Sequence, residues 1–177
     1  MAASPVFLDT ETTGLGPNAE ICEIALIDHD GTVLLDTLIK PTVPIPRDAT
    51  RIHGITNAHV RGEPAFAETW PVIAKQLAAR TVIIYNSDFD LRMIRQSLSA
   101  GRSHGTGTLL EIEAQCAMLL YASYYGDWND HHQSYTCQKL EAAARHCRLP
   151  VPQDLHRAKA DAELARRLVM HMANGAL

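Results

Sequence analysis

Two carboxylates, Asp9 and Glu11, stand two positions apart at the end of an apolar stretch near the start of the chain. Residues 6–8 are predicted to form a buried strand, so both carboxylates point to the same side of it. Two negative charges this close repel each other, and a divalent cation such as Mg²⁺ or Mn²⁺ resolves the conflict. Open α/β sheets bind ligands at the carboxyl edge of their strands. A polar turn over residues 9–14 is the alternative interpretation.

Two further acids are candidates for the same cation. Asp90 follows a β-branched strand predicted at 81–85, and its alternative role is that of an acid favouring the macrodipole in the first turn of a helix. Asp161 lies on the apolar stripe of a helix predicted over 157–172, where a charge needs either a metal or an arginine as partner. That stripe recurs at steps of three and four residues: Ala158, Asp161, Ala165, Leu168 and Met172.

A histidine lies just before this helix. His156 and Asp161 are five residues apart, so in an ideal helix they point roughly 140° apart. Both can face one site only if His156 comes from the loop or helix start that Pro150 and Pro152 create. Histidine titrates near neutral pH, so a histidine placed there is suited to act as a general base.

Composition narrows the class of protein. The 177 residues, 46% of them hydrophobic, suit one domain, and the longest apolar runs are far too short to span a membrane. The start of the chain resembles no signal peptide, and the four cysteines show no zinc or disulfide spacing, so a cytoplasmic protein with free thiols is expected. The net charge of −4 argues against a broad basic face for nucleic acid. It does not exclude a nuclease that holds phosphates through metal ions.

Periodicity predicts a meander of strands followed by alternating strands and helices, and hence a mixed sheet covered on both faces. An Asp-Gly pair at 30–31 is a hairpin signal between the second and third strands. The glycine-rich segment 101–107 is predicted to be a loop. Strands are expected at 5–9, 21–28, 32–39, 81–85 and near 110–113, short helical turns at 49–53 and 57–60, and helices at 66–79, 87–98, 116–125, 136–147 and 157–172.

Four segments in order along the chain carry a family resemblance. They are Phe7–Leu15 (FLDTETTGL), Ile52–Thr56 (IHGIT), Asn86–Asp90 (NSDFD) and His156–Ala162 (HRAKADA). In these segments the chain resembles the DEDDh exonucleases, the superfamily of the proofreading subunit of bacterial DNA polymerase III and of ribonuclease T. The resemblance covers nearly the whole chain and selects Asp90 over Asp88 as the third acid.

The resemblance implies an α/β, ribonuclease H-like fold, a mixed central β-sheet flanked by α-helices, in a single exonuclease domain over residues 1–177. It also implies that Asp9, Glu11, Asp90 and Asp161 hold two Mg²⁺ or Mn²⁺ ions. Two such ions about 3.5–4 Å apart stabilise the attacking and leaving oxygens of an in-line displacement at phosphorus. His156 would then deprotonate the attacking water.

The same resemblance implies contacts to the nucleotide at a 3′ end. For the two apolar members, Leu15 and Phe89, ordinary core packing is the alternative. The implied contacts are Thr12, Thr13, Gly14 and Leu15 on the terminal nucleotide, His53 near its sugar, and Asn86 and Phe89 supporting the pocket.

Two features depart from the family pattern. Tyr85 stands where the family often has a histidine before Asn86. The segment Tyr121–Tyr135 concentrates aromatic residues, which stack bases, bury a dimer interface or pack onto the core. Core packing is the expectation for Tyr121 and Tyr125.

The sequence therefore predicts a metal-dependent 3′-to-5′ exonuclease that releases nucleoside 5′-monophosphates from single-stranded DNA. Short RNA is the second substrate, and a homodimer is one expected use of the aromatic segment. A non-catalytic nucleic-acid or polymerase-binding subunit is a rival class, and a phosphohydrolase of free nucleotides or sugar phosphates is another. The complete set of four acids and His156 argues against the binding subunit.

Overall fold

The computed structural model describes residues 4–100 and 112–175. Its main sheet has five strands in the order β3-β2-β1-β4-β5. The first three strands form an antiparallel meander, whereas β4 and β5 run parallel to β1, so the sheet is mixed as predicted. The strands are β1 (Val6–Thr12), β2 (Ile21–Asp28), β3 (Val33–Leu38), β4 (Val82–Ile84) and β5 (Ala114–Cys116).

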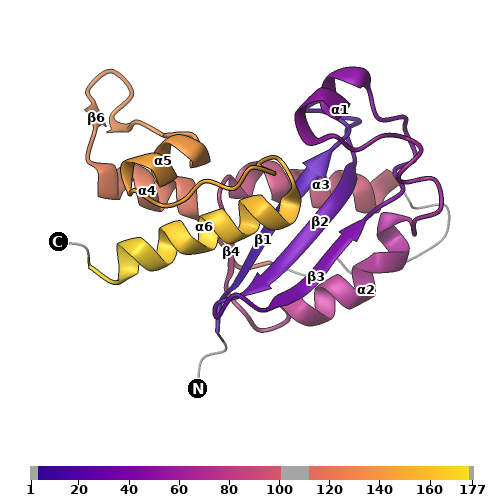
Figure 1. Cartoon of the computed structure of the whole chain (residues 1–177), viewed down its shortest axis with the longest axis horizontal. Coiled ribbons are helices and arrows are strands. Elements are labelled where there is room, and N and C mark those ends of the chain that lie inside the picture. The colour runs from indigo at the N-terminus through magenta and orange to yellow at the C-terminus, as the bar shows by residue number, and fades with distance from the viewer. Residues whose placement is uncertain (1–3, 101–111, 176–177) are drawn as a thin grey trace.

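Helices cover both faces of this sheet. In Figure 1, α6 crosses the front of the strands, while α2 and α3 lie behind them. No helix in the described ranges is long and apolar enough to span a membrane. The helices are α1 (Arg47–His53), α2 (Phe66–Leu77), α3 (Ser87–Ala100), α4 (Ala117–Tyr125), α5 (Leu140–His146) and α6 (Ala158–Ala173).

Successive side chains of β1 point to opposite faces of the sheet and enter two separate hydrophobic cores. Val6 and Leu8 enter the core shared with α2 and α3, and Phe7 enters the core shared with α4, α5 and α6. Side chains two positions apart share a face of a strand, so Asp9 and Glu11 lie on the α6 side. The apolar pattern of the first strand therefore fixes which helix its carboxylates meet.

The observed elements differ from the prediction in three places. β1 continues through Thr12, so Asp9 and Glu11 stand on the strand itself, and the polar-turn interpretation is wrong. The strand expected near 110–113 is β5, which begins at Ala114. The helix expected over 136–147 begins at Leu140, after a hairpin of β6 (Trp128–Asn129) and β7 (Ser134–Tyr135) that was not predicted. Residues 101–107 and 110–111 lie outside the described part of the chain.

Candidate active site

Three predicted acids converge between β1 and α6. Asp9 and Glu11 project from β1, and Asp161 projects from the first turn of α6. One carboxylate oxygen from each lies within 4.8 Å of the others. The sheet order makes this possible because α6 packs directly over β1 and β2. Residues from opposite ends of the sequence thus meet at one edge of the sheet.

The fourth acid, Asp90, approaches from the other side of the sheet. It is only 4% exposed and lies in the first turn of α3. The Thr10 hydroxyl donates a hydrogen bond to Asp90 Oδ1 at 2.7 Å, which ties this carboxylate to β1. Asp88, in contrast, is exposed. Asp90 is therefore a buried carboxylate attached to the central strand, and not merely a solvated acid at a helix start.

The electrostatics of the cluster call for cations. Burial, followed by repulsion from Asp90, Asp161 and Glu11, raises the pKa of Asp9 well above its usual value. Burial and the neighbouring acids raise the pKa of Glu11 to about 8, and burial raises the pKa of Asp90 to about 7. Burial also raises the pKa of Asp161. A donor set of carboxylate oxygens with surplus negative charge fits Mg²⁺ or Mn²⁺.

His156 lies beside this cluster in the loop that enters α6. It is exposed and has a left-handed backbone, with φ of 68°. Its backbone N–H donates to Asp161 Oδ1 at 3.2 Å. His156 therefore precedes the helix and does not belong to it, as the spacing required.

A fifth acid, Glu23, was missed by the sequence analysis. It lies on β2 directly opposite Glu11 in the strand register, and it is buried. Arg157 forms an ion pair with Glu23, and no arginine in the described part of the chain pairs with Asp161, so the arginine alternative for Asp161 is not borne out. The signal in the sequence was a single carboxylate inside the otherwise apolar run of β2.

The predicted nucleotide contacts at 12–15 lie at the last residue of β1 and in the loop that follows it. The Thr12 hydroxyl donates to the Gly14 carbonyl at 2.8 Å, and the Thr13 hydroxyl accepts the Glu20 N–H at 3.0 Å. Gly14 has φ of 153°, in the region that favours glycine. Leu15 is 77% exposed, so the core-packing alternative is wrong for this residue.

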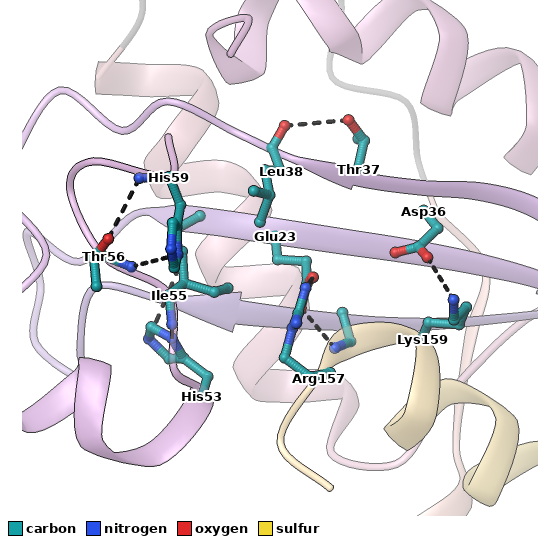
Figure 2. Close-up of polar contacts among 12 residues, drawn as sticks. Glu23, Asp36, Thr37, Leu38, His53, Ile55, Thr56, His59, Arg157 and Lys159 are labelled. Carbon is teal, nitrogen blue, oxygen red and sulfur yellow. Dashed lines mark hydrogen bonds and ion pairs between the residues drawn. The ribbon is translucent and has the colours of Figure 1, made fainter. Parts of the chain in front are cut away.

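His53 lies beneath the same loop, and both of its ring nitrogens have internal partners. Nδ1 accepts the Ile55 N–H at 3.0 Å, and Nε2 lies 3.2 Å from the Thr12 carbonyl oxygen. Figure 2 shows the ring next to Ile55. Burial lowers the pKa of His53, which favours the neutral ring with its proton on Nε2. The ring thus supports the backbone at Thr12.

The remaining predicted contacts lie around the start of α3. Asn86 is exposed, whereas Phe89 is half-buried and packs against the core, as its alternative interpretation held. The Arg92 guanidinium carbon lies 5.3 Å from the centre of the Phe89 ring. Tyr85, at the departure from the family pattern, is buried, and its hydroxyl donates to the Gln138 carbonyl at 2.8 Å.

The aromatic segment divides between core and surface. Tyr121 is fully buried, as expected, but Tyr125 is 42% exposed, so core packing is the wrong interpretation for Tyr125. Its ring meets His146 edge-on, with 4.9 Å between the ring centres. The Trp128 and Tyr135 rings meet edge to face across the β6–β7 hairpin, with 5.1 Å between their centres. Within the described residues, this hairpin places aromatic side chains at the surface.

A mixed sheet flanked by helices, with carboxylates at the end of its central strand, defines the class of ribonuclease H-like nucleases. Residues 6–169 match the sequence profile of the RNase T exonucleases. The chain belongs to the RNase T exonuclease family and is a 3′-to-5′ exonuclease.

Individual relatives agree with this family. The chain is 41% identical over 172 residues to the uncharacterized exonuclease CP81 of Escherichia phage 186, covering 96% of this chain and 88% of that protein. It is 35% identical over 100 residues to DNA polymerase III subunit epsilon of Rickettsia typhi, covering 53% of this chain and 44% of that subunit. Exonuclease X, solved with a 5′-overhanging duplex DNA, superposes with a TM-score of 0.73 at 25% identity, covering 97% of this chain and 92% of that chain.

Proposed function

We propose that this exonuclease, as one domain over residues 1–177, removes nucleoside 5′-monophosphates from the 3′ end of single-stranded DNA. The observation that carries the proposal is the convergence of Asp9, Glu11 and Asp161 within 4.8 Å, with Asp90 beside them. These four carboxylates would hold two Mg²⁺ or Mn²⁺ ions. Bound there, the metals supply positive charge to the attacking and leaving oxygens of the phosphodiester.

The protein groups have separate parts in the reaction. The four acids fix the cations at the end of β1, and His156 takes the proton of the attacking water. The exposure of His156 at the mouth of the cluster supports this part, because a general base must reach water and return its proton to solvent. The bond from the His156 N–H to Asp161 keeps the base next to the metal ligands.

The loop after β1 would receive the terminal nucleotide. Leu15, exposed at its tip, offers an apolar side chain to a base, and Gly14 leaves space for close approach, since nothing lies within 4 Å of where its Cβ would stand. Thr12 and Thr13 shape the loop, and His53 supports it from below. Asn86, exposed just before α3, would complete the proposed pocket, and Phe89, packed against the core, would support it.

DNA is the proposed substrate because a DNA polymerase III subunit is among the relatives, and because Exonuclease X was solved with DNA. We place the enzyme in the cytoplasm, a reducing compartment that suits its four free cysteines.

The test compares 5′-labelled single-stranded DNA, duplex DNA and single-stranded RNA in Mg²⁺, Mn²⁺ or EDTA. We expect a ladder of products shortened from the 3′ end, with release of nucleoside 5′-monophosphates. Cleavage should be fastest on single-stranded DNA, and no cleavage should occur in EDTA. Faster cleavage of RNA would overturn the DNA preference. Hydrolysis of free nucleotides with no cleavage of oligonucleotides would point to a phosphohydrolase instead.

A further inference from the structure

Glu23 is a buried carboxylate outside the proposed ligand set. It is only 2% exposed and stands on β2 across from Glu11. A buried charge needs a partner of opposite sign and satisfied hydrogen bonds. Glu23 has both, and within the described ranges its side-chain partners come from one short segment of the chain.

That segment is the start of α6. Arg157 Nε donates to both oxygens of Glu23, at 3.0 and 3.1 Å, and Arg157 Nη2 donates to Oε1. The Ala158 N–H donates to Oε2 at 2.9 Å. Figure 2 shows the Arg157 guanidinium against the Glu23 carboxylate. A guanidinium fork on a carboxylate fixes orientation as well as distance.

The contact also provides a hydrogen-bond acceptor for a backbone N–H in the first turn of the helix. Arg157 is the N-cap residue of α6, but its own side chain makes no capping hydrogen bond. The first N–H groups of a helix have no partner within the helix, and a nearby negative charge stabilises them. Glu23 therefore caps α6 from a neighbouring strand.

Arg157 and Ala158, the two residues that Glu23 holds, lie between His156 and Asp161 in the sequence. His156 directly precedes Arg157, and Asp161 follows Ala158 within one turn. We infer that Glu23 is a positioning residue, which holds Arg157 and the Ala158 N–H and so fixes both Asp161 and His156 against the acids of β1. The catalytic meaning of this inference rests on the proposed function, in which Asp161 is a ligand and His156 the base.

A second ion pair at the same helix turn provides a matched control. Lys159 Nζ lies 3.0 Å from Asp36 Oδ2 on β3, and both side chains are substantially more exposed than Glu23. Figure 2 shows this pair beside the first. Solvent-exposed ion pairs contribute little to the stability of the folded state. Asp36→Asn therefore removes one ion pair from the start of α6 without disturbing Glu23.

The central variant is Glu23→Gln. Its amide nitrogen donates where a carboxylate oxygen accepted, so one of the contacts to Arg157 or Ala158 is lost, while the half-exposed Arg157 is left solvated. We expect kcat on single-stranded DNA to fall about 10- to 100-fold, as is typical of residues that orient ligands, with KM little changed. Asp36→Asn should keep the kcat of the wild-type enzyme.

Two measurements separate positioning from simple destabilisation. In a His156→Ala background, Glu23→Gln should lower kcat by a smaller factor than in the wild type, because the base it positions is already gone. Hydrogen exchange of the metal-free protein is the readout independent of activity. The segment 155–161 should exchange faster in Glu23→Gln and remain unchanged in Asp36→Asn.

Circular dichroism decides whether Glu23→Gln is folded. If it is not, Arg157→Lys, which keeps the charge but loses the fork, takes its place with the same expectations. A folded variant with wild-type kcat overturns the inference while the proposed function stands. If the wild type releases no nucleotides at all, the proposed function fails. Unchanged hydrogen exchange at 155–161 in Glu23→Gln would separately show that Glu23 does not hold the start of α6.

Discussion

Asp9 and Asp161 are half-buried carboxylates held near other acids, so each is a source of repulsion without metal and, in the proposed function, a ligand when metal is bound. Asp9→Ala and Asp161→Ala should abolish release of mononucleotides and leave the fold intact. Without metal, both variants should melt at a higher temperature than the wild type because they remove a repelling charge. Thermal melting in EDTA and a cleavage assay test this. Near-normal activity in Mg²⁺ would show that the substituted residue is no essential ligand.

Glu11 makes the stability of the metal-free protein depend on pH. Its pKa is raised from 4.5 to about 8, so the folded state holds this proton more tightly than the unfolded state. The stability contributed by this group is fully present below about pH 4.5 and is lost as the pH rises to about 8.

The melting temperature in EDTA should therefore fall between these pH values more steeply in the wild type than in Glu11→Gln. The glutamine at this position cannot titrate, which makes the variant the matched control. Added Mg²⁺ should raise the wild-type melting temperature most at the alkaline end, where the site is most anionic. Identical pH profiles of the two proteins in EDTA would contradict the raised pKa of Glu11.

His156 is exposed, so its removal should affect chemistry more than stability. His156→Ala is expected to lower kcat by about 10² to 10⁴-fold, the usual loss for a general base, while Mn²⁺ binding measured by calorimetry survives. His131→Ala, on the exposed β6–β7 hairpin, is the control that should retain full activity. A His156→Ala rate equal to that of the wild type would assign the proton to another group.

The sequence singled out three acids of the cluster because a charge is unusual in their apolar surroundings, whereas the family resemblance selected the fourth, Asp90. Asp9, Glu11 and Asp161 were found through periodicity, which also placed His156 outside the helix. The sequence analysis did not assign Glu23 to the site because its partner, Arg157, lies far away in the sequence. Local periodicity does not reveal a pairing between β2 and the start of α6, and only the fold brings these two residues together.

Among the secondary-structure elements, α3 holds the loop that carries Leu15. Gln96 Nε2 donates to the carbonyls of Gly16 and Ala19, at 3.2 and 2.7 Å, and Arg92 donates to the Leu15 carbonyl at 3.3 Å. Gln96→Ala should loosen this loop and raise KM for single-stranded DNA several-fold, with a smaller effect on kcat.

Ser99→Ala is the control for that variant, because among the described residues the Ser99 hydroxyl donates to the carbonyl of Arg95 within α3 and not to the loop. Steady-state kinetics of the two variants make the comparison. A larger effect of Ser99→Ala than of Gln96→Ala would mean that α3 does not act through the loop.

The elements predicted well are those with a clear apolar pattern, as in β2 and α6. The helix expected from residue 136 fails because its backbone groups are used elsewhere. The Thr136 N–H donates to the Asp127 carbonyl at the base of the hairpin, and the Gln138 carbonyl accepts the Tyr85 hydroxyl. These are contacts made by tertiary structure, and they override a local helical pattern.

The molecule as a whole carries a net charge of −4, and three of the basic side chains near the site have acidic partners, whereas Arg92 contacts the Leu15 carbonyl and the Phe89 ring. Arg157 is held by Glu23, Lys159 by Asp36 and Arg51 by Asp48. Few Lys and Arg side chains are therefore left to contact phosphates. The divalent metal ions should contribute most of the binding affinity for the 3′ end.

Binding of a fluorescent single-stranded oligonucleotide to His156→Ala, in Ca²⁺ or EDTA at several NaCl concentrations, measures this. With two or three phosphate contacts at about −0.7 each, the slope of log K against log salt should be roughly −1.5 to −2. Removal of the divalent ion should weaken binding more than added salt does. A steep slope that is unaffected by EDTA would indicate an extended basic surface and favour a binding subunit.

The site joins β1, the first strand, to α6, the last helix, so its ligands come from nearly opposite ends of the matched region 6–169. A ribosome-bound chain whose α6 segment is still inside the exit tunnel has only part of the cluster. Contacts this distant in sequence form late, because the intervening chain must be ordered first. If the proposed ligands are right, the nuclease should therefore be inactive while it is being made, and it should become able to cut only once the segment through Asp161 has emerged and docked on the sheet.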